Sequence, residues 1–143
     1  MRTILLSAIV VTAASIVPAV ADAQPSPIAA VKSCDFEFST TLPTVLQPRV
    51  TARGMAFCDL PPEEHTLTLA LEYKDRGRWA NGSYVTDRTI PSHSGHPYEV
   101  SAACYAGEWR MTVSVTGMMQ GNPFVFSDHS KTRAIPSSQC PSR

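Results

Sequence analysis

The chain lacks an excess of charge, and it lacks the patterns that helices and membrane spans require. Its 12 basic and 12 acidic side chains cancel among 143 residues, so it has no general electrostatic means of holding nucleic acid or an anionic lipid surface. No segment shows an apolar period of 3.6 residues, which disfavours a helical core. After the N-terminal segment no apolar run is long enough to span a bilayer. We therefore expect no nucleic-acid partner and no membrane span in the mature chain.

The common signatures of catalysis are also missing. The sequence has no Cys-x-x-Cys motif for dithiol redox chemistry and no Gly-x-Ser-x-Gly turn to present a nucleophilic serine. It also has no obvious set of four ligands for a structural zinc ion. The sequence therefore predicts no cofactor. It leaves an enzymatic role open but favours a non-enzymatic one.

The first residues have the three parts of a secretory signal peptide. A cationic start at residues 1–3 precedes an apolar run at 4–17, and two overlapping small-residue sites follow at 19–21 and 21–23. The run is too short to span a bilayer comfortably, so a retained membrane anchor is the weaker interpretation. We expect residues 1–23 to be removed and the mature protein to be secreted or extracytoplasmic.

The rest of the chain divides into a lead-in and one domain. Residues 24–33 contain two prolines and show no clear period, which predicts a flexible lead-in. Residues 34–143 are enough for a single domain with a modest core.

The dominant pattern of this domain is a period of two, which predicts half-buried β-strands. The predicted strands are 34–38, 50–58, 65–73, 85–90, 98–104, 109–116, 124–127 and 132–135. Turn-forming residues fall between them, and Asn81-Gly82 predicts a hairpin tip. Seven or eight short strands predict an all-β fold, an antiparallel β-sandwich with an immunoglobulin-like outline.

Four cysteines lie beyond the expected cleavage point, where disulfides form and persist. They are Cys34, Cys58, Cys104 and Cys140. If successive strands alternate up and down, Cys34 meets Cys58 at one end and Cys104 meets Cys140 at the other. The rival arrangement joins Cys58 to Cys104 between sheets and Cys34 to Cys140. Both arrangements give two disulfides, and the first is favoured.

Several landmarks together resemble a known class of protein. They are the segment 56–58, the strand at 65–73, Trp79, the segments 88–91 and 104–110, and Cys140. In these features the chain resembles small exported bacterial β-sandwich proteins with an immunoglobulin-like outline. The resemblance covers most of the mature region and implies a fold and a compartment. It implies no activity and no site residues.

Three groups of polar residues could carry chemistry, and each has a plainer interpretation. His93 and His96 could reach one metal ion from a proline-bounded loop, but a polar surface loop is the simpler account. The run 128–130 holds the three residue types of a catalytic triad, yet neighbours on a strand face opposite ways and cannot form the relay. The run 63–65, Glu-Glu-His, is most simply a solvated loop end.

The tryptophans and one asparagine also have plain interpretations. Trp79 and Trp109 are expected in the core or at its rim, and not on a carbohydrate platform. The run 81–83, Asn-Gly-Ser, matches an N-glycosylation acceptor. A hairpin tip would explain these residues without a glycan.

The best candidate for a partner contact is the predicted hairpin tip at 117–124. It brings together Met118, Met119 and Phe124. Flexible thioethers beside an aromatic ring would make an adaptable apolar patch if they were exposed. In the alternative interpretation, both methionines fold back over the open end of the core.

These observations favour an exported, non-enzymatic binding or envelope-associated module whose ligand is unknown. Its partner would be a protein, a cell-wall polymer or a small apolar ligand, met through loops on a stable scaffold. The alternative is a small extracellular hydrolase, or a protease inhibitor that uses a rigid loop such as 91–97.

Overall fold

The computed structural model describes residues 33–143, and this part of the chain consists of β-strands and their connections. The predicted signal peptide, and all of the predicted lead-in except Ser33, lie outside the described residues. The strands are β1 (Cys34–Phe38), β2 (Thr44–Leu46), β3 (Arg49–Cys58), β4 (Glu64–Asp75), β5 (Arg78–Asp87), β6 (His96–Ala103), β7 (Gly107–Met119), β8 (Asn122–His129) and β9 (Arg133–Ile135). In the described part there is no helix long and apolar enough to cross a membrane.

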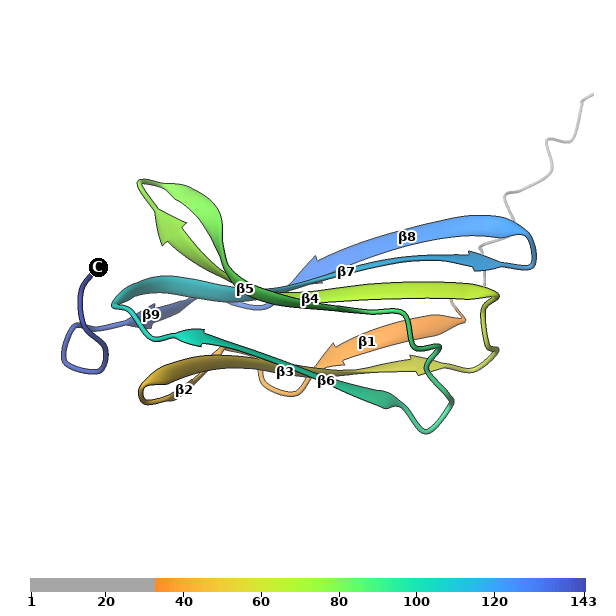
Figure 1. The fold of residues 1–143 in the computed structure, drawn as a ribbon, viewed down its shortest axis with the longest axis horizontal. Coiled ribbons are helices and arrows are strands. Elements are labelled where there is room, and N and C mark those ends of the chain that lie inside the picture. The colour runs from red at the N-terminus through yellow and green to blue at the C-terminus, as the bar shows by residue number, and fades with distance from the viewer. Residues whose placement is uncertain (1–32) are drawn as a thin grey trace, which may run out of the picture. The chain divides into compact units, whose positions relative to one another are not determined.

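The strands form two antiparallel sheets, which lie one above the other in Figure 1. In the first sheet β3 is central, with β6 along one edge and β1 and β2 sharing the other. The second sheet has the order β5-β4-β7, and β8 and β9 share the free edge of β7. Each sheet therefore has one edge that is divided between two strands.

The prediction of an all-β fold is confirmed, but the described residues contain nine strands where seven or eight were expected. The additional strand, β2, has only three residues, too few to show an alternating pattern. Strand β5 begins at Arg78, well before its predicted start at Val85. A β-bulge in the β4–β5 ladder breaks the alternation there, so the period-two pattern misses the first half of the strand.

The predicted hairpin tip at Asn81-Gly82 is wrong. The turn between β4 and β5 is Arg76-Gly77, and both residues have positive φ, 47° and 79°, as a two-residue hairpin requires. Gly82 lies in the bulge of β5, where an added Cβ would be 2.9 Å from the ring of Trp109. Glycine is needed there so that the strand can pack closely on Trp109.

The core lies between the two sheets. The second sheet supplies the larger side chains, from Leu67, Leu69 and Leu71 of β4 and from Trp109, Met111, Val113 and Val115 of β7. The first sheet supplies mostly smaller ones, including Val50, Ala52 and Ala56 of β3 and Val100 and Ala102 of β6. The inward faces predicted for 65–73, 98–104 and 109–116 are thus confirmed. Each fully buried leucine or valine contributes roughly 1.5–3 kcal/mol, so this core is the main source of stability.

Two disulfides support this core, and their pairing is the favoured one. Cys34 is bonded to Cys58, and Cys104 to Cys140, so the rival arrangement is excluded. Cys34 and Cys58 are direct partners across the β1–β3 ladder. The second bridge joins the residue after β6 to the segment that follows β9. It therefore ties the first sheet to the end of the second.

The two divided edges meet on one side of the two sheets. The N–H of Lys131 donates to the carbonyl of Thr41 at 3.2 Å, and the Arg133 guanidinium donates to the carbonyl of Pro43 at 3.0 Å. These bonds join the break between β8 and β9 to the break between β1 and β2. The opposite side is formed by the edge strands β5 and β6.

Candidate functional site

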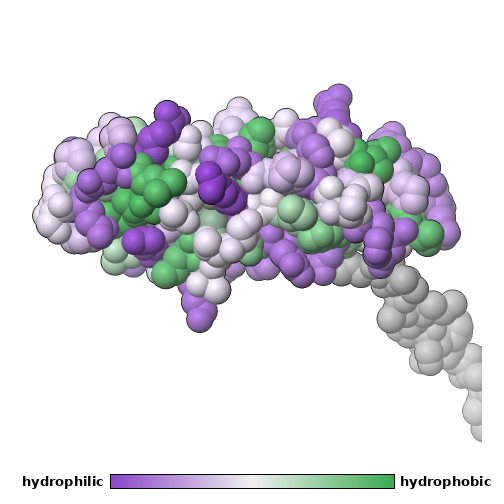
Figure 2. Space-filling view, turned by 90° about the horizontal axis from the view of Figure 1, so that it is seen from below, coloured by the Kyte–Doolittle hydropathy of each residue, from purple (hydrophilic) through white to green (hydrophobic). Residues whose placement is uncertain are grey.

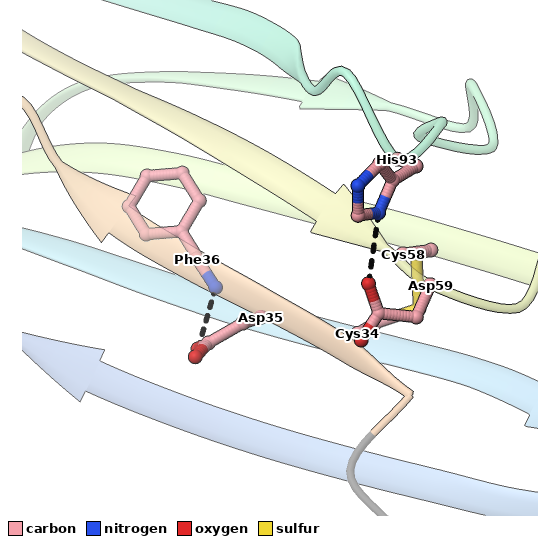
Figure 3. The surroundings of a disulfide bond; sticks show 6 residues. All are labelled: Cys34, Asp35, Phe36, Cys58, Asp59 and His93. Carbon is pink, nitrogen blue, oxygen red and sulfur yellow. Dashed lines mark hydrogen bonds and ion pairs between the residues drawn. A yellow bond between two sulfur atoms is a disulfide. The ribbon is translucent and has the colours of Figure 1, made fainter.

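The two histidines of the predicted metal loop have separate partners. Nδ1 of His93 lies 3.0 Å from a carboxylate oxygen of Asp59, beside the first disulfide (Figure 3). Nε2 of His96 lies 3.3 Å from a carboxylate oxygen of Asp87. Within residues 33–143, no group of three or more His, Cys, Asp or Glu side chains could hold a metal ion. Each imidazole therefore contacts a different carboxylate.

The loop considered for a protease inhibitor is a compact turn held against β3. The carbonyl of Ser92 accepts the N–H of Gly95 at 3.0 Å and the N–H of Cys58 at 3.3 Å. The hydroxyls of Ser92 and Ser94 lie 2.8 Å apart. Because Cys58 ends β3 and belongs to the first disulfide, its hydrogen bond to Ser92 anchors the loop at that end of the strand.

The residues at 128–130 are placed by structural bonds. A carboxylate oxygen of Asp128 accepts the backbone N–H of His129 at 2.7 Å. The hydroxyl of Ser130, which is buried, accepts the N–H of Met111 and donates to the carbonyl of Lys131, each at 2.9 Å. Ser130 thereby fastens the break between β8 and β9 to β7.

The predicted contact hairpin forms, but its three named residues are divided between two faces. The turn is Gln120-Gly121, with φ of 50° and 73°, and Met118 and Met119 are the last residues of β7. By strand alternation Met118 takes the outer side, while Met119 and Phe124 take the inner side. All three are half-buried, and Phe124 packs against the core. Only Met118 is placed to join a contact on the outer face.

A partly buried polar cluster has members from β4 and from the edge strands β5 and β6. It consists of His65, Asp87, His96 and Tyr98, and we call it the His65 cluster. The rings of His96 and Tyr98 have centroids 5.0 Å apart. Asp87 accepts two hydrogen bonds of 2.7 Å from Thr89 in addition to its contact with His96. His65 is only 3% exposed, so the expectation of a solvated loop end at 63–65 is wrong for this residue.

Burial is the main cause of the shifted pKa values of His65 and Tyr98, and hydrogen bonding is the main cause for Asp87. Burial lowers the pKa of His65, and the Thr89 backbone and the Asp87 charge oppose this only in part. Hydrogen bonds from Thr89 lower the pKa of Asp87. Burial, with the nearby charge of Asp87, raises the pKa of Tyr98 to about 12. Nδ1 of His65 and the hydroxyl of Tyr98 have no hydrogen-bond partner within the described part of the chain.

A shallow pocket of about 440 Å³ lies against the second disulfide. Its lining residues are Gln47, Pro48, Ala103, Cys104, Tyr105, Gln139, Cys140 and Pro141. The side-chain amide of Gln47 donates a hydrogen bond to the carbonyl of Gln139. The lining offers apolar surface and uncharged polar groups.

The outer face of the second sheet carries rows of hydroxyl side chains from four paired strands. The registers place Thr66 beside Thr116, and Thr68 between Thr86 and Ser114. These residues point outward because they alternate with the buried core positions of the same strands. We call this set the hydroxyl face: Thr66, Thr68, Thr86, Thr112, Ser114, Thr116 and Ser127.

Two exposed apolar side chains flank the hydroxyl face. Tyr84 on β5 is 62% exposed and is paired with Ala70 of β4. Val125 on β8 is 74% exposed and is paired with Thr116 of β7. The face therefore combines hydroxyl groups with an aromatic ring at one edge and an aliphatic side chain at the other.

Charged groups occur at the rim of this face. One row beyond Ala70, Arg110 and Glu72 form a half-buried ion pair of 2.7 Å. The guanidinium of Arg110 also lies 4.3 Å from the ring centroid of Trp79. Trp109 is in the core, as expected. Trp79 is half-buried, but it is paired with Lys74 and contacts Arg110, so it lies on the outer face of the second sheet and not at the rim of the core.

The outer face of the first sheet has a different character. Arg53 and Glu99 form an exposed ion pair of 2.9 Å at its centre. Arg49, Asp35 and Glu37 are also exposed on these strands. Figure 2 views the molecule from this side and shows hydrophilic residues spread among smaller hydrophobic patches. The two outer faces therefore differ in charge.

No protein-family model, curated protein or solved structure matches this chain.

Sequence reasoning did not identify the hydroxyl face. The available signals are Thr-x-Thr at 66–68 and Thr-x-Ser-x-Thr at 112–116, both with their polar residues on the outward side of a strand. These two runs become one surface only when β4 and β7 are paired in the observed register. Tyr84 was missed for another reason, because the bulge in β5 hides its alternation.

Proposed function

We propose that the protein is an exported, non-enzymatic binding module that works at the cell envelope or outside the cell and contacts its partner through the hydroxyl face. The observation that carries this proposal is that the hydroxyl rows at the centre of this face carry no Lys, Arg, Asp or Glu side chain. Charged side chains are depleted from the centres of binding interfaces because their desolvation is costly. A face of hydroxyl groups and exposed apolar groups has a smaller desolvation penalty when a partner covers it.

The proposal includes an immunoglobulin-like sandwich of the kind that small exported bacterial proteins have. Lettered in chain order, β3 corresponds to B, β4 to C, β5 to C′, β6 to E and β7 to F, with the divided edges as A and G. The first sheet then has the order A-B-E and the second C′-C-F-G, which supports this outline. The disulfides differ from those of antibody domains, since neither joins B to F.

Two observations support the proposed compartment. Both disulfides are buried within the fold, and all four cysteines that the sequence contains take part in them. Such bonds persist in oxidising compartments and are rare in the cytosol. The N-terminal signal pattern points the same way.

A single charge at the centre of the hydroxyl face tests the proposal. Ser114 is exposed in β7 between Thr68 and Ser127, so Ser114→Glu adds a charge without disturbing the core. Ala103→Glu is the matched control, because Ala103 is exposed on the first sheet. The oxidised protein is sedimented with envelope fractions from the producing cells, separated into delipidated polysaccharide, membrane protein and phospholipid vesicles.

We expect the wild type and Ala103→Glu to sediment with one of these fractions. We expect Ser114→Glu to bind it about tenfold more weakly, as loss of a central contact would imply. Equal binding by Ser114→Glu and the wild type would overturn the proposal, and so would a wild type that sediments with none of the fractions. Thermal melts of all three proteins exclude misfolding as the cause.

A further inference from the structure

We infer that the ligand of the hydroxyl face is a neutral polysaccharide chain. This inference rests on the proposed function and adds to it the chemical class of the ligand. A hydroxyl group both donates and accepts hydrogen bonds, so rows of threonine and serine match a ligand whose own groups are uncharged hydroxyls. Within residues 33–143, only Thr68 and Thr86 on this face hydrogen bond to each other, at 2.8 Å. The other hydroxyls remain available to a ligand.

Tyr84 supplies the second part of a sugar-binding surface. A sugar ring has an apolar face of C–H groups and a polar rim of hydroxyls, so it packs on an aromatic ring that has hydrogen-bonding groups beside it. The Tyr84 ring is 62% exposed on β5, and the Thr68–Thr86 pair lies in the next row of the same strands. Tyrosine offers both an apolar ring and a polar tip. The ring and the hydroxyl rows therefore suit one ligand.

The distribution of charge disfavours an anionic polymer. The cation in the adjoining row, Arg110, is already paired with Glu72 at 2.7 Å and stacked on Trp79. An anionic chain would have to give up solvation against hydroxyl groups that carry no charge. A neutral chain has no charged group to desolvate, so charge complementarity favours a neutral ligand.

The size of the face disfavours a second copy of this chain as the occupant. Four strands spaced about 4.8 Å apart, over three outward rows at about 6.8 Å, cover roughly 400 Å². A stable protein interface needs about 800 Å² on each partner. The face is therefore small for a protein partner and suitable for a few sugar rings of a longer chain.

The test uses soluble neutral glucans and a carboxylated glucan of similar length as probes. Their binding to the full oxidised protein is measured by affinity electrophoresis and calorimetry. We expect Tyr84→Ala to weaken binding of a neutral glucan about tenfold and Tyr84→Phe to keep it within about threefold. Leu46→Ala, which removes a similarly exposed apolar side chain from the first sheet, should have no effect. Binding of a neutral chain should also be insensitive to salt.

Three results would overturn the inference: tighter binding of the carboxylated glucan, no binding of any neutral glucan, or unchanged binding by Tyr84→Ala. The Ser114→Glu experiment separates this failure from failure of the proposed function. If Ser114→Glu loses envelope binding while no neutral glucan binds, the ligand class is wrong and the binding face stands. If Ser114→Glu keeps envelope binding, the binding face is wrong as well.

Discussion

His65 takes an inward position of β4, on the same face of the strand as three buried leucines. Desolvation makes its imidazolium form costly, and this is the main cause of its lowered pKa. The unfolded chain therefore binds this proton more readily than the folded one. Protonation of His65 therefore couples pH to the free energy of unfolding.

The sign of this effect follows from linkage. The contribution of a neutral His65 is fully present above its ordinary pKa of 6.5 and is lost as the pH falls from there toward the lowered folded value. We expect the midpoint of denaturant unfolding, with disulfides intact, to fall between neutral pH and about pH 5. Asp87, whose pKa is also lowered, acts only in more acidic solution.

His65→Phe is the control for this prediction. It fills the same inward position with a group that does not titrate, so the unfolding midpoint should become flatter over this pH range. A pH dependence identical to that of the wild type would show that another group is responsible.

The β7–β8 hairpin turn is shaped by backbone conformation and one carboxylate. Gln120 and Gly121 both have positive φ, and the side chain of Glu63 accepts their N–H groups at 2.9 and 3.4 Å. Glycine adopts this region without strain, whereas residues with a Cβ do so at a cost and asparagine at a lower one. An added Cβ at Gly121 meets no atom within 4 Å, so substitution there reports on conformation alone.

Two substitutions in this turn should have opposite effects. Gly121→Ala should destabilise the protein by about 1 kcal/mol, because alanine is strained at positive φ. Gln120→Asn should stabilise it by about 0.5 kcal/mol, because asparagine tolerates this conformation in type I′ turns. Chemical denaturation of both variants measures the two effects. If both shifts have the same sign, the turn does not have this conformation in solution.

The strands show which features of the fold the sequence predicts and which it does not. Regular alternation at 65–73 and 109–116 predicts which residues are inside, because burial of one strand face requires that pattern. It cannot show that Asn81-Gly82 is a bulge, because this depends on Trp109, a residue far along the chain. The buried state of His65 likewise depends on β5 and β6. Pairing register is a long-range property, and the hydroxyl face exists only through it.

At the scale of the whole molecule, two bridges hold the sheets at different places. One lies within the first sheet, and the other joins the end of β6 to the segment after β9. They close loops with sequence separations of 24 and 36 residues. In the chain-entropy account each contributes about 3–4 kcal/mol, against a typical total of 5–15 kcal/mol for a domain.

Removal of either bridge should therefore lower the melting temperature markedly. Cys34→Ala with Cys58→Ala, and Cys104→Ala with Cys140→Ala, test the two bridges separately, and the wild type treated with reductant tests them together. Calorimetry of the three samples should show the reduced wild type as the least stable. Melting temperatures equal to that of the oxidised protein would contradict this account of stability.

Packing against the first sheet and the two disulfides hold the second sheet in place. The inward side chains of β4 and β7 fill the core, and this fixes the outward positions of the same strands. A surface of short hydroxyl side chains on such a support loses little conformational entropy when it is covered. The stability of the scaffold and the proposed binding face are thus two consequences of the same alternation.

The most direct measurement is an NMR titration of the isotopically labelled, oxidised protein with a soluble neutral glucan. Binding of a neutral polysaccharide to the hydroxyl face predicts that shift changes concentrate at the outward positions of β4, β5, β7 and β8, with Tyr84, Thr68 and Ser114 among the strongest. Changes confined to the pocket beside Cys104 and Cys140, or to the charged face around Arg53 and Glu99, would contradict it.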